Sequence, residues 1–242
     1  CRLKSIPAAL ERSRSGNGGH VWILFSEPLP AATARRLGAF LLTATMERRP
    51  EIGLDSYDRM FPNQDTLPRG GFGNLIALPL QRKPRDGGNS VFVDESFTPY
   101  ADQWAFLAAV RRMVLSEVEA VTAPVGGDSE CLGVRAPILD EDETQPWQVP
   151  PSGRRPDPPP QGALPDQIDL VIANQIYVPK KQLSPWLRNR IQRLAAFANP
   201  DFLQAQAMRL PTYKLPRIVS CSEEFPEHLA LPRGCLDDVN EL

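Results

Sequence analysis

The sequence has no long hydrophobic run and no large excess of either charge. It contains no stretch of about eighteen apolar residues, the length that a helix needs to cross a bilayer, and no secretory signal is visible. We therefore expect a cytoplasmic protein without membrane contact. The formal net charge is -2, so any surface for nucleic acid has to be a local patch and not a property of the whole chain.

Cysteine is scarce as well. Four cysteines, Cys1, Cys131, Cys221 and Cys235, lie far apart and form no CxxC pair. This usage argues against a disulfide framework and is typical of reduced thiols in a cytosol. Cys221, His228 and Cys235 are evenly spaced, but they match no zinc pattern and lack a fourth ligand, so the two cysteines are better interpreted as buried or idle thiols.

What the sequence does contain is a glycine-rich turn, Ser13 to His20, that runs directly into the apolar stretch 21–25. Its glycines and asparagine permit positive φ, and the exposed amides of such a turn suit phosphate oxygens. Neighbouring arginines and serines add donors, and His20 adds an imidazole that can bond a phosphate or bind a metal. A tight surface loop with a packed histidine is an equally weighted alternative, because short glycine patterns are common.

Hydrophobic periodicity predicts a mixed α/β fold. Arg35 and Arg36, in the first helix, are expected to face solvent, and Trp104 is expected to be a packing anchor. The expected strands are 21–25, 73–80, 90–93, 168–178 and 217–221, and the expected helices are 31–48, 101–121, 185–198 and 201–208. Ser184 is expected to cap the helix at 185–198, with Pro185 in its first turn.

Composition divides the chain into three parts. After Thr122 the periodic pattern stops, and residues 123–166 hold an acidic run and several proline clusters. Such a composition predicts a flexible linker. The predicted organisation is therefore an N-terminal domain at 1–122, the linker, and a C-terminal segment at 167–242.

Three aspartates, Asp55, Asp58 and Asp65, lie within eleven residues beside a predicted strand. Hard divalent cations take carboxylate oxygens, so these residues could hold one. Aspartate is also common in turns because its side chain bonds the nearby backbone. Both interpretations stay open on the spacing alone.

The turn at 15–20, the stretch 55–65 and the stretch 73–80 together resemble the archaeo-eukaryotic primase superfamily. More narrowly, they look like the primase domain of the TOTE conflict systems, in which a primase precedes a helicase. The later stretches 173–179, 207–213 and 231–235 look like the segment that joins those two domains. The resemblance implies an RRM-like catalytic fold with a C-terminal α/β connecting segment.

The resemblance further implies template-directed nucleotidyl transfer. In that superfamily an acid pair, a serine-x-histidine turn and a third acid cooperate, and the acids hold two divalent metals, Mg²⁺ or Mn²⁺, at the α-phosphate. By the motif match, His20 takes the triphosphate role, and the third acid is Asp58, with Asp55 as the alternative. The nucleotide-binding residues implied in this way are Ser15, Gly16, Asn17, Gly18 and His20.

The sequence departs from the family pattern before the turn. Residues 1–14 contain no DxD or DxE pair and only one acid, Glu11. We therefore expect a fold that is incomplete at the N-terminus and a chain that binds nucleotide or DNA weakly and does not polymerise by itself. After Leu231 no helicase signature follows, so a helicase domain or subunit is expected as a partner, beside DNA template and nucleoside triphosphates.

Two alternatives stay open. The first is a non-catalytic nucleic-acid-binding remnant that uses the arginine-rich helix at 185–198. The second is an unrelated phosphate-binding α/β protein, which would require the match over 58–80 to be chance.

Overall fold

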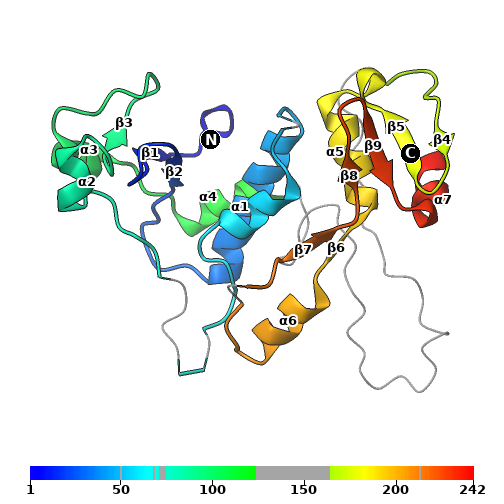
Figure 1. Ribbon diagram of the computed structural model, residues 1–242. Coiled ribbons are helices and arrows are strands. Elements are labelled where there is room, and N and C mark those ends of the chain that lie inside the picture. The colour runs from blue at the N-terminus through cyan, green and yellow to red at the C-terminus, as the bar shows by residue number, and fades with distance from the viewer. Residues whose placement is uncertain (50, 68, 71–74, 124–163, 213) are drawn as a thin grey trace.

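The computed structural model describes residues 1–49, 51–67, 69–70, 75–123, 164–212 and 214–242 (Figure 1). Helices and antiparallel sheets are both present, which confirms the predicted mixed α/β class. The helices are α1 (Ala31–Met46), α2 (Arg82–Asp86), α3 (Gln103–Ala109), α4 (Leu115–Thr122), α5 (Pro185–Leu194), α6 (Pro200–Ala207) and α7 (Leu236–Asn240). The strands are β1 (Ala9–Arg12), β2 (Gly19–Trp22), β3 (Phe92–Val93), β4 (Val171–Ile172), β5 (Ile176–Pro179), β6 (Ala196–Ala198), β7 (Ile218–Ser220), β8 (Glu223–Glu224) and β9 (His228–Leu231).

The N-terminal sheet has the strand order β2-β1-β3, and all its pairs are antiparallel. The central strand β1 follows the period of two: Ala9 and Glu11 are buried, and Leu10 and Arg12 are half-buried. The strand predicted at 21–25 is β2, which begins at Gly19 and ends at Trp22. Strand β1 was not predicted, because its inward face carries an acid in place of an apolar residue.

Helix α1 matches the predicted helix closely and joins two parts of the core. Leu37 packs with Ile6 and Met113, whereas Met46 packs with Ala196 and Ile218 from β6 and β7. The expectation that Arg35 faces solvent is wrong: the residue is 2% exposed, and its guanidinium donates to the carbonyl of Pro62.

The single helix predicted at 101–121 is two helices, α3 and α4. The chain leaves the helix because Met113 forms a parallel bridge with Phe25, and its amide donates to the carbonyl of Leu24 at 2.8 Å. Asp102 caps α3 by accepting from the amides of the first turn. Trp104 in that turn is 62% exposed, so its prediction as a packing anchor is wrong.

The strand predicted at 73–80 does not form over 75–80, the part of it that the structure describes. Leu75 is 80% exposed, and only Leu80 at the end of the stretch is buried, where it packs with Val91 and Phe92. Among the described residues between α1 and β3, the elements are a 3₁₀ turn and α2, with no strand.

The C-terminal sheet has the order β4-β5-β9-β8 and packs on α5 (Figure 1). Ser184 caps α5 as predicted, since its hydroxyl accepts from the amide of Leu187 and Pro185 follows at the first position. The arginines of α5 are engaged with the protein: Arg193 is 7% exposed, and Arg188 pairs with Glu224 of β8.

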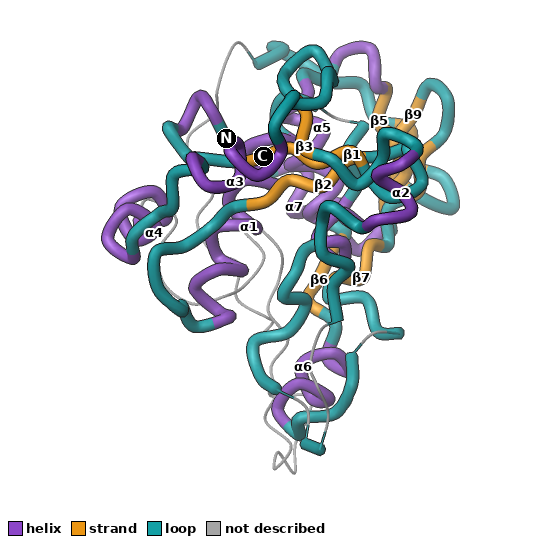
Figure 2. Tube along the Cα trace, turned by 90° about the vertical axis from the view of Figure 1, so that its left-hand side faces the viewer, coloured by secondary structure: helices purple, strands orange, loops and turns teal. Residues whose placement is uncertain are grey.

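Strands β6 and β7 pair with each other and lead to α6, which projects away from both larger sheets in the two views (Figure 1 and Figure 2). Asn199 caps α6 and ties it to the carbonyl of Pro216 at 2.8 Å. Through β6 and β7, the C-terminal segment packs directly on α1.

Candidate nucleotide-binding site

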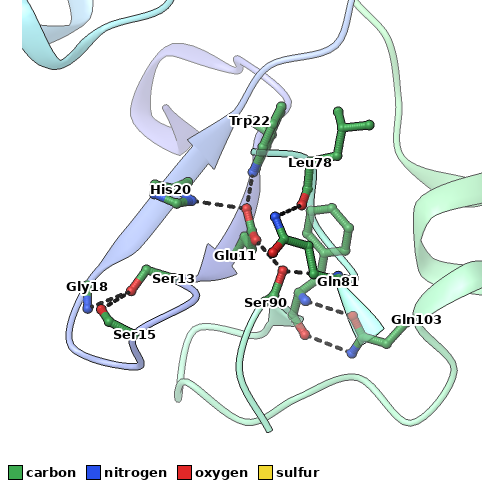
Figure 3. Close-up of polar contacts among 11 residues, drawn as sticks. Glu11, Ser13, Ser15, Gly18, His20, Trp22, Leu78, Gln81, Ser90 and Gln103 are labelled. Carbon is green, nitrogen blue, oxygen red and sulfur yellow. Dashed lines mark hydrogen bonds and ion pairs between the residues drawn. The ribbon is translucent and has the colours of Figure 1, made fainter. Parts of the chain in front are cut away.

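The Ser13–His20 turn connects β1 to β2 in a tightly bonded hairpin (Figure 3). The amide of Ser13 donates to the carbonyl of Gly18 at 2.8 Å, and the amide of Gly16 donates to the carbonyl of Ser13 at 3.0 Å. The Ser13 hydroxyl also accepts from the Gly18 amide at 3.1 Å. The turn is therefore preorganised, and two of its glycine amides are occupied within it.

Gly16 has a specific conformational role in this turn. Its φ is +83°, in the left-handed region that favours glycine, and an added Cβ would lie 2.9 Å from Oδ1 of Asn89. A side chain at Gly16 would therefore strain the backbone and also crowd the Asn89 side chain. The turn is thus shaped by its contact with the 87–90 loop as well as by its own sequence.

His20 lies directly opposite Glu11 in the hairpin register. Its Nδ1 is 3.1 Å from Oε2 of Glu11, and that oxygen also accepts from Nε1 of Trp22 at 2.6 Å. The other carboxylate oxygen accepts from the hydroxyl of Ser90 at 3.1 Å. The His20 side chain is 52% exposed, whereas that of Glu11 is 3% exposed. The ring is held from inside the protein and open to solvent.

Further donors lie on the turn beside His20. Ser15 and Asn17 are exposed, and the hydroxyls of Ser13 and Ser15 are 3.1 Å apart. Arg14 is exposed, but Arg12 is committed to the protein, since it donates to the carbonyls of Gly88 and Phe97. An anion at the turn would therefore meet hydroxyls, the Asn17 amide, Arg14 and the imidazole.

The proposed acids lie on a different part of the fold. Asp55 and Asp58 are in the 3₁₀ turn Leu54–Arg59, where Leu54 packs beside α1 with Ala196 and Ile218. The Asp55 side chain is 68% exposed and pairs with Arg59 at 3.6 Å. The side chain of Asp58 lies outside the described part of the structure. The described contacts do not bring Asp55 to the hairpin.

The described side chains do not fit a divalent metal centre. Among them, no group of three acidic, histidine or cysteine side chains gathers at one point. Asp55 is paired with Arg59, and both oxygens of Glu11 already accept from donors of the protein.

Asp65, the third predicted aspartate, belongs to a buried ion cluster. Its two oxygens lie 3.4 Å from Nε of Arg35 and 3.5 Å from Nη2 of Arg217. Gln206 of α6 donates to the same carboxylate at 3.2 Å. The described contacts of Asp65 are thus structural, and the metal interpretation does not hold for this residue.

Glu11 is the functional candidate that sequence reasoning missed. Its one signal is its position, because it is an acid on the inward face of a strand. A hairpin that pairs Arg12 with Gly19 places Glu11 opposite His20. The third partner, Ser90, is far away in the sequence and could not be paired with Glu11 from the pattern.

Residues 1–121 match the model of a family described as "TOTE conflict system, Archaeo-Eukaryotic Primase domain". A search of curated proteins finds no match. The matched range contains the whole hairpin, Glu11, Ser90 and both proposed acids. In the part of the chain that the structure describes, every helix is too short or too polar to cross a membrane.

Proposed function

Because the chain belongs to the archaeo-eukaryotic primase family of the TOTE conflict systems, we propose that it binds the triphosphate of an incoming nucleotide at the Ser13–His20 turn. The family carries out primase-type nucleotidyl transfer on nucleic acid. In this proposal the chain supplies the nucleotide-binding part of that reaction. The match confirms the family that the sequence motifs indicated.

The observation that carries the proposal is the arrangement of His20. The His20 side chain, at the start of β2, is half exposed. On its buried side, Oε2 of Glu11 lies 3.1 Å from Nδ1 of the ring. The exposed hydroxyl of Ser15 and the exposed Arg14 lie on the same turn. Hydroxyl, guanidinium and imidazole donors suit phosphate oxygens, and a site built on paired strands holds them in fixed positions.

The residues of the chain would bind and orient the triphosphate. Domains of this family use divalent metals, and such an ion stabilises the charge that develops on a transferred phosphoryl group. We propose Asp58 or Asp55 as the family's third acid, in the 3₁₀ turn beside α1. DNA template and a helicase domain or subunit are the partners that we propose for the reaction.

The experiment is a titration of the chain with inorganic triphosphate and with a nucleoside triphosphate, in EDTA so that no metal contributes, followed by calorimetry. We expect His20→Ala to weaken binding about ten- to hundredfold, the effect of losing one charge-assisted hydrogen bond. The matched control is His228→Ala in β9, which alters the second of the two histidines in the chain. Equal affinities for wild type and His20→Ala would overturn the proposal.

A further inference from the structure

Glu11 is a carboxylate in the interior of the N-terminal sheet. It lies on the central strand β1 and is 2% exposed. A buried carboxylate is costly unless donors surround it. Here Trp22, His20 and Ser90 supply three, at 2.6, 3.1 and 3.1 Å. Two of them come from β2 and one from the residues before β3, so both neighbouring strands contribute to holding the carboxylate.

The donors around Glu11 fix the direction of each hydrogen bond. An indole N–H can only donate, so Trp22 donates to Oε2. The Ser90 hydroxyl accepts from the amide of Gln81 at 3.3 Å, which leaves its own hydrogen for Oε1 of Glu11. An ionised carboxylate has no hydrogen to give. The Nδ1 atom of His20 must therefore carry the hydrogen of the bond to Glu11.

The consequence concerns the other ring nitrogen. With Nδ1 protonated and bonded, Nε2 is the nitrogen left for a ligand, and within the described residues His20 makes no second side-chain hydrogen bond. A neutral ring presents a lone pair at Nε2, which repels an anionic oxygen. A ring that takes a second proton from solvent presents an N–H there, which can donate to that oxygen.

We propose that Glu11 is a positioning residue for His20. It fixes the ring orientation and the Nδ1–H tautomer, and its negative charge balances the imidazolium that forms when Nε2 donates to a phosphate oxygen. The other charged groups on this hairpin are Arg12, which is bonded to two backbone carbonyls, and the exposed Arg14. The inference rests on the proposed function, since it deepens the role of the same turn.

The wild-type chain itself gives the first test. After labelling histidine with ¹⁵N, long-range ¹H–¹⁵N spectra report the tautomer of both histidines, with His228 as the internal reference. We expect His20 to be the Nδ1–H tautomer at a pH where the ring is neutral. An Nε2–H tautomer would overturn the inference without any variant.

The second test replaces the carboxylate. Glu11→Gln keeps the size and one acceptor but removes the charge, and we expect about tenfold weaker binding of inorganic triphosphate together with a changed tautomer balance at His20. Glu27→Gln, at an exposed position, removes the same charge as a control. Ser90→Ala removes one donor to Glu11 and keeps the carboxylate, so it should preserve the tautomer even where Glu11→Gln fails to fold.

The outcomes separate the two proposals. If Glu11→Gln folds and leaves both tautomer and binding unchanged, the positioning role is overturned and triphosphate binding stands. If His20→Ala binds triphosphate like wild type while His20 shows the Nδ1–H tautomer, the proposed function fails and the Glu11–His20 arrangement stands as structure alone.

Discussion

Arg217 pairs with Asp65 at 3.5 Å, and the two residues lie on opposite sides of residues 124–163 in the sequence. Arg35 of α1 lies 3.4 Å from the second oxygen of the same carboxylate. Nearby, Thr212 donates to the side chain of Gln64 at 2.9 Å, and both of these residues are buried. The loop that follows the proposed acids is therefore held jointly by α1 and by the C-terminal segment.

Replacing Asp65 should destabilise the whole chain. Asp65→Asn removes the negative charge that lies 3.4 Å from Nε of Arg35 and 3.5 Å from Nη2 of Arg217, two residues that are 2% and 3% exposed. Removing one partner of a buried ion pair costs about 3 to 5 kcal/mol, so the free energy of unfolding in urea should fall by that amount. As a control, Glu51→Gln breaks the exposed pair with Arg49 and should leave the urea midpoint of unfolding unchanged. An unchanged midpoint for Asp65→Asn would contradict the prediction.

Glu224 should make the C-terminal sheet sensitive to acid. Burial raises the pKa of this carboxyl, but hydrogen bonds from Lys180 and Arg188 and their charges outweigh it, so the pKa lies below its ordinary value of 4.5. A lowered pKa contributes stability above pH 4.5, and this stability is lost as pH falls through the folded pKa. Urea unfolding from about pH 6 to about pH 3 should show the advantage of wild type over Glu224→Gln shrinking with acid.

The control for this measurement is Glu223→Gln on the same strand, because Glu223 accepts from the amide of Gln175 and forms no ion pair in the described residues. The difference in the free energy of unfolding between wild type and Glu223→Gln should vary less with pH. A constant advantage of wild type over Glu224→Gln at all pH values would refute the assignment.

The chain by itself should bind nucleotide without extending a primer. Two-metal phosphoryl transfer needs carboxylates gathered around the ions, and the acid in contact with His20 is Glu11, whose oxygens accept from three donors. The assay supplies Mg²⁺ or Mn²⁺, labelled nucleotides and a primed template, and nucleotide binding in the same sample shows that the chain is folded. Robust extension would show that the chain holds a complete metal centre.

Local signals predicted the elements that depend on neighbouring residues. The Ser184–Pro185 pair predicted the start of α5, and the spacing of apolar residues predicted α1. Both follow from capping and periodicity within about one or two helical turns. The apolar run after the glycine-rich turn predicted a strand at 21–25, and β2 begins two residues before it, at Gly19.

Features that depend on distant residues could not be predicted in this way. Arg35 is buried beside Asp65 and the carbonyl of Pro62, and Glu11 is buried because Ser90 completes its donors. The break between α3 and α4 follows from the bridge of Met113 to Phe25. In each case the partner lies far along the chain, so neither composition nor period marks it.

The pairing of Glu11 with His20 makes the position of the imidazole depend on the register of the hairpin. The Arg12↔Gly19 pair closes the turn, and Glu11↔His20 is the next pair along the strands. Side chains alternate between the two faces of a strand, so a shift of the pairing between β1 and β2 by one residue would turn the imidazole to the opposite face of the sheet. The register of β1 and β2 is therefore a requirement for the site in addition to Gly16, whose φ is +83°.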